Sequence, residues 1–394
     1  MSTPKILVTG GGGFLGGRLV ERLLLAEKIV PRAMGYSPAG SVRLCRLPVD
    51  LCWCNILKSE QVAKAVEGCD VVIHCAYGAG GSDELQRAVT VDGTRNLAVE
   101  AQKAGVKKFV HISTQGVYSY LPDGGPIADE TLPMKPSGDV YCDTKMEAEN
   151  VLWEMHRNGG LPLTVLRMGN IWGPFSAPYT VGPISAIRAG VISVVNGGKH
   201  ASNAIHVDNA VEAILLAVRE AQAIGQIYHV TDSDELTWEQ LYQPYADWIG
   251  AELKSIDFAD IAKLAAAGAD DVGFFADAWK NAVLPILKYS SFQANSTKSL
   301  GGLQKKLWKM TPESLRERCR KRVLDNPKTE YRPPALKVTQ KVAKPPSADL
   351  LHVYGHGVCF SNKKLKEELG YEPRASHEEC LAVTKAWAKS ARHI

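Results

Sequence analysis

The sequence predicts an α/β protein built on a doubly wound parallel β-sheet. Short apolar runs recur along the chain, and most of them are followed by a longer stretch whose apolar residues have helical spacing. Glycine or other small residues follow several of these runs, which places turns at the ends of the predicted strands. Strands that alternate with helices in this way form βαβ units with right-handed crossovers. Ligands of such sheets bind at the carboxyl ends of the strands.

The first unit begins at Lys5. Residues 5–9 form a short apolar run with β-branched character, which predicts a buried strand. A glycine cluster at 10–13 follows, and from Phe14 onward the apolar residues have the spacing of an amphipathic helix. Glycines in such a turn allow positive φ and the close approach of a pyrophosphate, which the N-terminus of the helix attracts. The stretch therefore favours a dinucleotide site.

The glycine spacing allows two registers, Gly11, Gly13 and Gly16 or Gly10, Gly13 and Gly16. A glycine pattern alone is weak evidence, because strand-to-helix turns rich in glycine also occur without a ligand. Other parts of the chain must decide between these alternatives.

Composition excludes several classes of protein. With 394 residues and 45% apolar content, the chain can form one large domain or two with a sizeable core. It has no run of eighteen apolar residues and no basic segment followed by an apolar one at the N-terminus, so neither a membrane span nor a secretory signal is expected. The nine cysteines are scattered and form no metal-binding spacing. We expect reduced thiols, a cytoplasmic location and no metal.

The next units repeat the pattern. Residues 28–34 predict a second strand, and residues 61–66 show a further apolar alternation. The runs at 71–76 and 107–114 predict buried strands, with a helical pattern at 89–104 between them. The small residues that follow the first strand and the strand at 71–76 should then meet residues 113–115 at one edge of the sheet.

The end of the second strand bears on the choice of cofactor. An NAD-preferring site has a carboxylate there that accepts hydrogen bonds from the adenosine ribose and repels a 2′-phosphate. No Asp or Glu lies between Lys28 and Asp50, which weakly favours NADP, with Ser37 and Arg43 as candidate phosphate contacts. The alternative is that other groups hold the ribose.

A helical pattern at 137–160 carries Tyr141 and Lys145, which lie four residues apart and therefore on one face. A phenol has an ordinary pKa of about 10, and a nearby ammonium lowers this pKa by favouring the phenolate. With a hydroxyl from Ser113 or Thr114, the groups needed for proton transfer to a carbonyl oxygen are present. Taken alone, a Tyr and a Lys at this spacing occur on many surface helices.

Three segments together resemble one family. TGGGGFLG near the N-terminus, HISTQGVY in the middle and YCDTK after it resemble the extended short-chain dehydrogenase/reductase family. This family includes nucleotide-sugar epimerases and dehydratases and enzymes of the 3β-hydroxysteroid dehydrogenase type. The resemblance covers residues 5–250 and 360–394, and it implies a Rossmann domain with a smaller substrate-binding portion. It also selects the register Gly10, Gly13 and Gly16.

The resemblance assigns roles to individual residues. Thr114 matches the catalytic hydroxyl, Tyr141 the general acid/base, and Lys145 the residue that lowers the Tyr141 pKa and holds the nicotinamide ribose. Asn170 occupies a position that contacts substrate phosphate in sugar-nucleotide members. The residues that the resemblance and the strand ends assign to the cofactor are Gly10, Gly13, Phe14, Leu15, Gly16, Ser37, Asn55, Ile56, Ala76, Tyr141 and Lys145.

Departures from the family pattern narrow the chemistry. The 4,6-dehydratases follow the catalytic Thr with an Asp–Glu pair, and here Gln115 and Gly116 stand there, which disfavours dehydration. The segments YHVTDSDELTW and VYGHGVCFSNKKLKEELGYEP are more similar to the hydroxysteroid dehydrogenase type. Thr90 stands where many members have Asn, so the proton relay through that Asn is not expected.

We therefore expect three regions. Residues 1–250 form the NAD(P)-binding domain with substrate-binding segments around 171–205, residues 251–347 form a basic insertion, and residues 348–394 complete the substrate-binding portion. Between 298 and 344 the chain has fourteen Lys or Arg and four Asp or Glu. This composition suits an anionic membrane surface or an acidic ligand, and equally a solvated linker. No nucleic-acid recognition motif accompanies the charge.

The predicted activity is hydride transfer between NAD(P)(H) and a secondary alcohol or ketone, as in 3β-hydroxysteroid dehydrogenases. A nucleotide-sugar epimerase or reductase with bound NAD is the first alternative. A non-catalytic protein that senses the dinucleotide or acts as a scaffold is the second. The expected partners are a small-molecule substrate and, from the resemblance, a second copy of the chain packed through the helix of Tyr141 and its neighbour.

Overall fold

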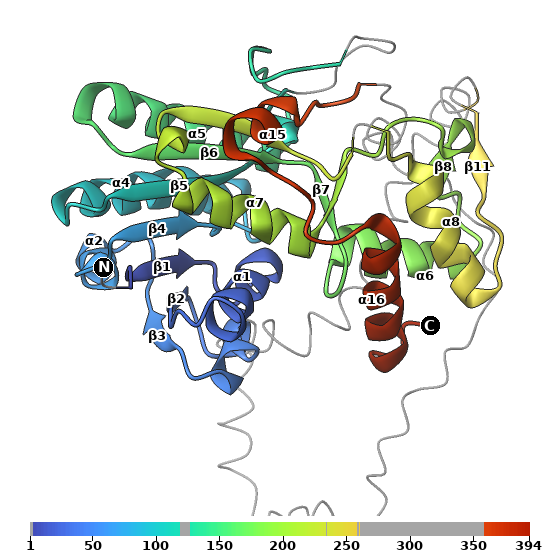
Figure 1. The fold of residues 1–394 in the computed structure, drawn as a ribbon, viewed down its shortest axis with the longest axis horizontal. Coiled ribbons are helices and arrows are strands. Elements are labelled where there is room, and N and C mark those ends of the chain that lie inside the picture. The colour runs from blue at the N-terminus through green and yellow to red at the C-terminus, as the bar shows by residue number, and fades with distance from the viewer. Residues whose placement is uncertain (1–2, 119–126, 234, 258–259, 261–357) are drawn as a thin grey trace, which may run out of the picture. The chain divides into compact units, whose positions relative to one another are not determined.

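The computed structural model describes residues 3–118, 127–233, 235–257, 260 and 358–394. Its centre is a seven-stranded sheet in which all neighbouring strands are parallel, with the order β10-β6-β5-β4-β1-β2-β3 (Figure 1). The strands are β1 (Ile6–Thr9), β2 (Arg32–Gly35), β3 (Asp50–Trp53), β4 (Val71–His74), β5 (Lys108–Thr114), β6 (Leu163–Met168) and β10 (Gln226–Val230). The order reverses direction beside β1, so the ends of β1 and β4 border the crevice where such sheets bind ligands. The predicted doubly wound α/β fold is confirmed.

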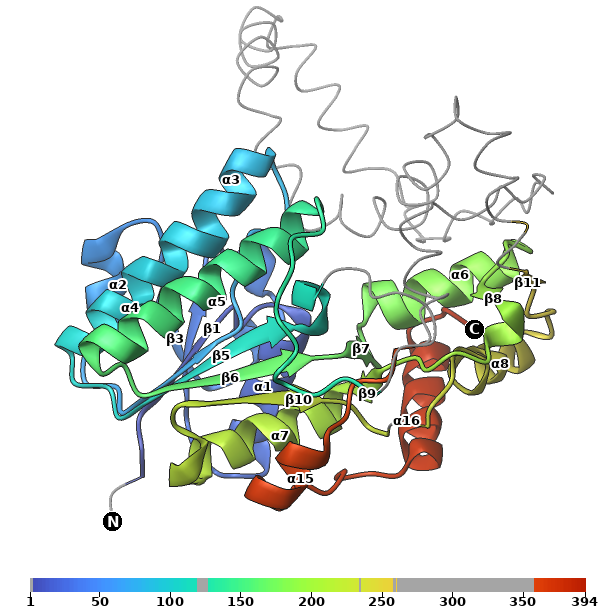
Figure 2. The same cartoon turned by 90° about the horizontal axis from the view of Figure 1, so that it is seen from above.

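Helices cover both faces of the sheet (Figure 2). One face carries α2 (Ser59–Val66), α4 (Gly93–Lys103) and α5 (Val140–Gly159), with the short α3 (Asp83–Arg87) beside α5. The other face carries α1 (Phe14–Leu25), α7 (Val207–Arg219) and α15 (Lys363–Leu369). Alternate residues of each strand therefore enter two separate hydrophobic clusters, and both faces of the sheet are buried.

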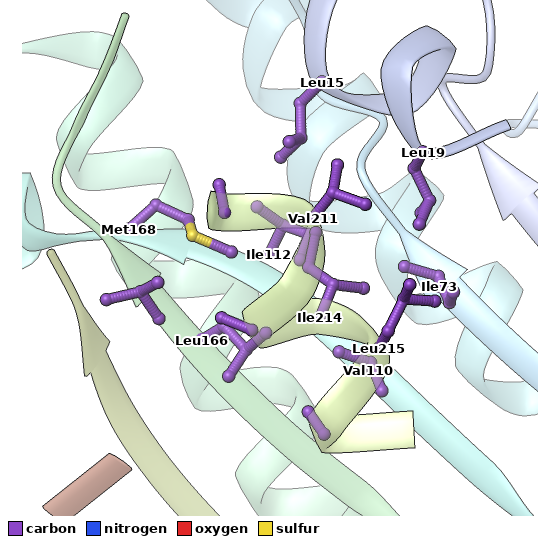
Figure 3. Packing of buried hydrophobic residues seen from close by; sticks show 14 of the residues in the cluster. Leu15, Leu19, Ile73, Val110, Ile112, Leu166, Met168, Val211, Ile214 and Leu215 are labelled. Atoms are coloured by element: carbon purple, nitrogen blue, oxygen red, sulfur yellow. The ribbon is translucent and has the colours of Figure 1, made fainter. Parts of the chain in front are cut away.

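Figure 3 shows the cluster under α1 and α7. Ile73, Val110 and Ile112 point from the strands toward Leu15 and Leu19 of α1 and toward Val211, Ile214 and Leu215 of α7, with Leu166 and Met168 alongside. These side chains are at most 9% exposed. The helical spacing of the apolar residues in α1 places one stripe on the sheet and leaves Arg18 and Glu21 on the outer face, which is why the local pattern predicted this helix correctly.

A smaller portion follows the sheet at the carboxyl ends of its strands. It contains α6 (Gly182–Arg188), α8 (Trp238–Ile249) and α16 (His377–Ser390), together with two short parallel pairs. The pairs are β7 (Asn170–Trp172) with β9 (Ala204–His206), and β8 (Val194–Val195) with β11 (Ser255–Ile256). Its core contains several fully buried aromatic side chains: Trp172, Trp238, Tyr242 and Tyr245. The C-terminal α16 packs against segments more than a hundred residues earlier in the chain.

Three local predictions differ from the structure. The second strand begins at Arg32 rather than at residue 28, and β3 was not predicted. The alternation at 61–66 lies in a helix, because Val62, Ala65 and Val66 are the buried positions and have helical rather than strand spacing.

The basic segment 298–344, and the predicted insertion from residue 261 onward, lie outside the described residues. Among the residues that the structure describes, no helix has the length and apolar content needed to cross a membrane. The same part of the chain contains no group of three His, Cys, Asp or Glu side chains placed to hold a metal ion.

Candidate active site

The glycine turn between β1 and α1 has the geometry of a pyrophosphate cradle. Gly10 adopts φ +65°, and its carbonyl accepts a hydrogen bond from the Gly13 N–H at 2.9 Å. A Cβ atom on Gly16 would lie 2.4 Å from the Gly10 carbonyl oxygen, so a larger residue does not fit. The N-terminus of α1 has no side-chain cap and no acidic residue in its first turn. The first N–H groups of α1 are therefore open to an anion such as a dinucleotide pyrophosphate.

We expect Gly16→Ala to raise the dissociation constant for the dinucleotide by about tenfold or more, because the added methyl must push the turn open. Gly17→Ala is the matched control, since it makes the same change in the same helix. Its Cβ would meet the flexible end of Arg43 at 3.2 Å, with the nearest backbone atom at 3.3 Å. Titration of each variant with NADH and NADPH measures the effect. Equal affinities in both variants would contradict this role of the turn.

The predicted adenosine contacts lie in the loops after β2 and β3. The Ser37 hydroxyl accepts from the Gly40 N–H at 3.3 Å, and the Asn55 side-chain oxygen accepts from the Leu57 N–H at 3.0 Å. Ile56 is 6% exposed and packs in the core beside α4. Arg43, expected as a phosphate contact, is paired with Glu21 of α1, with its Nε 2.6 Å from one carboxylate oxygen. Its guanidinium also lies 4.6 Å from the centre of the Phe175 ring.

The predicted catalytic residues come together at the ends of β5 and α5. Thr114 is the last residue of β5, and Tyr141 lies in the first turn of α5, which begins where the Asp139 carboxylate caps the Cys142 N–H at 2.9 Å. The Thr114 hydroxyl accepts from the Gly116 N–H at 3.1 Å and is close enough to the Tyr141 hydroxyl to lower the pKa of Tyr141. One turn further along the helix, the buried Lys145 donates a hydrogen bond to the Ile112 carbonyl of β5.

The protonation of Tyr141 differs from the expectation. Burial of its hydroxyl, together with the neighbouring Tyr77 and Cys142, raises the pKa of Tyr141 above its usual range, and only the Thr114 hydrogen bond acts in the opposite direction. The predicted lowering by Lys145 is therefore wrong for this structure, in which the ammonium bonds to the backbone of β5. The phenol of Tyr141 is protonated at neutral pH and is available as a proton donor.

Burial lowers the pKa of Lys145 to about 8, against the smaller opposing effects of Cys75 and Glu149. We therefore expect kcat/KM to fall as the pH rises through about 8, because the ammonium form exists below this pKa and is lost above it. A pH profile of kcat/KM from pH 6 to 10 measures this limb. A profile that stays level up to pH 10 would show that the charge of Lys145 is not needed.

Two residues of the site, Tyr77 and Glu149, were not predicted, and Ser113 differs from its predicted role. The Tyr77 ring, in the loop after β4, contacts the Tyr141 ring edge-on at 5.3 Å, and 45% of Tyr77 is exposed. Ser113 turns away from the Thr114 hydroxyl and donates to Glu149 of α5 at 2.8 Å. The placement of Glu149 four residues after Lys145, on the same helix face, is a signal in the sequence that could have identified it.

Two further positions that the sequence singled out have local partners. Asn170 in β7 donates from its side-chain nitrogen to the Ser202 carbonyl at 2.7 Å. Thr90 is 2% exposed, and its hydroxyl accepts from the Gly78 N–H at 2.9 Å, which fixes the loop that follows Ala76.

The chain has relatives of known name. The chain is 32% identical over 235 residues, covering 58% of this chain and 68% of the relative, to the 4-hydroxy-2-methyl-3-oxo-4-farnesyl-3,4-dihydroquinoline-1-oxide ketoreductase of Stigmatella aurantiaca. It is 30% identical over 263 residues, covering 62% and 70% of the two chains, to the 3β-hydroxysteroid dehydrogenase/Δ5→4-isomerase of Mycobacterium tuberculosis.

Solved structures share the fold. The UDP-glucose 4-epimerase of Thermotoga maritima, in complex with UDP-glucose, matches with a TM-score of 0.66 at 20% identity and covers 98% of this chain and 99% of its own. The model of the NAD dependent epimerase/dehydratase family matches residues 6–231, which include the glycine turn, Thr114, Tyr141 and Lys145. The chain therefore belongs to the NAD dependent epimerase/dehydratase family.

Proposed function

We propose that this protein is an NAD(P)-dependent oxidoreductase that transfers a hydride between the nicotinamide and a secondary alcohol or ketone of a lipophilic molecule. The observation that carries the proposal is the packing of α5 against β5, which places Tyr141 and the buried Lys145 beside the strand that ends in Thr114, at the same edge of the sheet as the glycine turn. The bound nicotinamide supplies or accepts the hydride.

The side chains supply the proton and hold the oxygen. In the direction of reduction, the protonated Tyr141 gives its proton to the carbonyl oxygen as this oxygen gains charge, and the Thr114 hydroxyl donates a second hydrogen bond that fixes it. The Lys145 ammonium, which bonds the Ile112 carbonyl, would hold the nicotinamide ribose beside Tyr141. The glycine turn from Gly10 to Gly16 would hold the pyrophosphate.

The proposed substrate class rests on the surroundings of Tyr141 and on the relatives. The exposed ring of Tyr77 lies directly beside the Tyr141 ring and gives the substrate an apolar contact. The names of the two relatives describe a ketoreductase of a farnesylated compound and a hydroxysteroid dehydrogenase. Both names point to lipophilic substrates.

A panel of sterol-like 3-ketones and other lipophilic ketones, set against UDP- and dTDP-sugars, tests the substrate class. Absorbance at 340 nm measures the consumption of NADH or NADPH. We expect steady consumption with at least one lipophilic ketone and none with the sugar nucleotides. The epimerase alternative predicts the opposite: a nucleotide that stays bound, is not consumed, and supports inversion of a sugar carbon. Binding of NADPH without hydride transfer to any compound of the panel would favour the sensor or scaffold protein.

We infer a preference for NADP over NAD from the end of β2, where Tyr36 and Ser37 stand and no carboxylate follows until Asp50. The pairing of Arg43 with Glu21 leaves Ser37 as the nearer polar candidate for the 2′-phosphate. Dissociation constants for NADPH and NADH, compared in one titration series, test this preference. The cytoplasmic location and the homodimer remain predictions from the sequence.

A further inference from the structure

A chain of buried polar side chains runs from the candidate catalytic strand into the sheet. Glu149 is fully buried on α5 and accepts hydrogen bonds from Ser113 on β5 at 2.8 Å and from the Arg167 Nε on β6 at 3.1 Å. Arg167 also donates to the Tyr118 hydroxyl, which in turn lies 2.6 Å from the His229 Nε2 on β10. All five side chains are at most 3% exposed. Three neighbouring strands and α5 are therefore joined by one network.

The position of this network relates it to the proposed chemistry. Ser113 directly precedes Thr114, and Glu149 follows Lys145 by one helical turn. Lys145 and Glu149 thus attach α5 to two successive residues of β5, through the Ile112 carbonyl and the Ser113 hydroxyl. These two bonds fix the register between the strand that carries Thr114 and the helix that carries Tyr141. Burying a carboxylate and a guanidinium is costly in free energy, so apolar residues would serve better if packing were the only requirement.

We propose that Glu149, held by Arg167, is a positioning residue: it bonds Ser113 from α5 and so keeps Thr114 in register with Tyr141 and Lys145. This inference rests on the proposed function, because it uses the same three residues as the reacting set. A second consequence is electrostatic. Glu149 is an anionic side chain that raises the pKa of Lys145 against the effect of burial.

The other titratable groups around Lys145 do not replace this charge. His74 on β4 and His111 on β5 are fully buried, and burial together with the Lys145 charge keeps both neutral by lowering their pKa values. Burial raises the pKa of the Cys75 thiol to about 12, so it is also neutral at physiological pH. Tyr141 is protonated for the same reason. Cys75, the other group that raises the pKa of Lys145, carries no charge at physiological pH, so the negative charge near Lys145 comes from Glu149.

The test uses the full chain and three variants. Ser113→Ala removes the bond to β5 and leaves the ion pair. The double variant Glu149→Gln with Arg167→Met removes both buried charges together, so neither is left unpaired. Thr164→Val is the matched control, because it deletes another buried hydroxyl away from the glycine turn and Tyr141. This hydroxyl donates to the Ala223 carbonyl at 2.7 Å. For each protein, the NADPH dissociation constant is measured from pH 6 to 10, and kcat and KM are measured on a ketone that the wild type reduces.

We expect Ser113→Ala to lower kcat about tenfold with little change in KM, since a small displacement of Thr114 weakens catalysis more than binding. We expect the double variant to lose NADPH affinity at a pH about one unit lower than the wild type, because Lys145 loses its proton earlier. Thr164→Val should match the wild type in both measurements. If Ser113→Ala keeps the wild-type kcat, the positioning role is overturned, and if the double variant loses affinity at the wild-type pH, the effect of Glu149 on Lys145 is overturned. This titration needs no substrate, so it tests the effect of Glu149 on Lys145 even if the proposed reaction is wrong. A separate experiment tests the reaction: hydride transfer retained by Tyr141→Phe would show that the proposed reaction is wrong.

Discussion

Replacement of Tyr141 by Phe should lower kcat by a factor of about 10² to 10⁴ and leave the dissociation constant of the dinucleotide within about twofold. The substitution removes only the hydroxyl and keeps the ring that packs against Tyr77. Under the proposed function, cofactor binding depends on the glycine turn and on Lys145, which the substitution leaves unchanged. Stopped assays of ketone reduction, together with fluorescence titration of NADPH, separate the two effects.

Tyr228→Phe is the control for this experiment. Tyr228 lies on the edge strand β10, away from Thr114 and Lys145. The substitution deletes its phenolic hydroxyl, which donates to the Glu368 carboxylate at 2.8 Å. Its turnover should equal that of the wild type. Full turnover by Tyr141→Phe on the same ketone would falsify the proposed role of the phenol, whatever the control shows.

The Gly10–Gly16 turn and α1 could be predicted because their signals are local. Strand, turn and helix follow one another within about twenty residues, and the spacing of Leu15, Leu19 and Leu23 alone distinguishes the helix from a strand. The alternation at 61–66 was misleading because it too is a local signal, but a shorter one. Six residues contain too few periods to separate a repeat of 2.0 from one of 3.6. Strand β3 was missed because it is an edge strand with the exposed residues Asp50 and Trp53 at its ends.

The candidate site also contains residues that local signals predict and residues that only the packing of the fold brings together. Tyr141 and Lys145 are one helical turn apart, and the segment that ends in Thr114 has a recognisable pattern, so sequence and resemblance could predict that all three lie in the site. Glu149 and Arg167 lie on different elements, and only the packing of α5 on the sheet brings them together. The raised pKa of Tyr141 could not be predicted either. It depends on how deeply the hydroxyl is buried and on the loop that brings Tyr77 against it.

Glu149→Gln alone should lower the free energy of unfolding by about 3 to 5 kcal/mol, because it leaves the buried Arg167 guanidinium without its counter-charge. The expected loss is a large part of the stability of a typical domain. Adding Arg167→Met should restore most of it, since the double variant buries an apolar side chain in place of an unpaired cation. Urea unfolding of the three proteins without cofactor, followed by circular dichroism, measures these differences.

The exposed ion pair of Lys103 with Glu100 provides the contrast. The two groups lie 2.7 Å apart, and 66% of the Lys103 side chain is exposed. Glu100→Gln should therefore change the free energy of unfolding by less than about 1 kcal/mol, because water solvates the remaining charge.

A Glu149→Gln protein no less stable than Glu100→Gln would mean that water or a neighbouring group compensates the charge of Arg167. The network would then be too adaptable to fix the position of Thr114. A large loss that the double variant recovers would mean that charge pairing, and not the shape of the Glu149 side chain, holds α5 to the sheet. In that case the lower alkaline pH limit of the double variant can be assigned to the missing carboxylate, since its fold is retained.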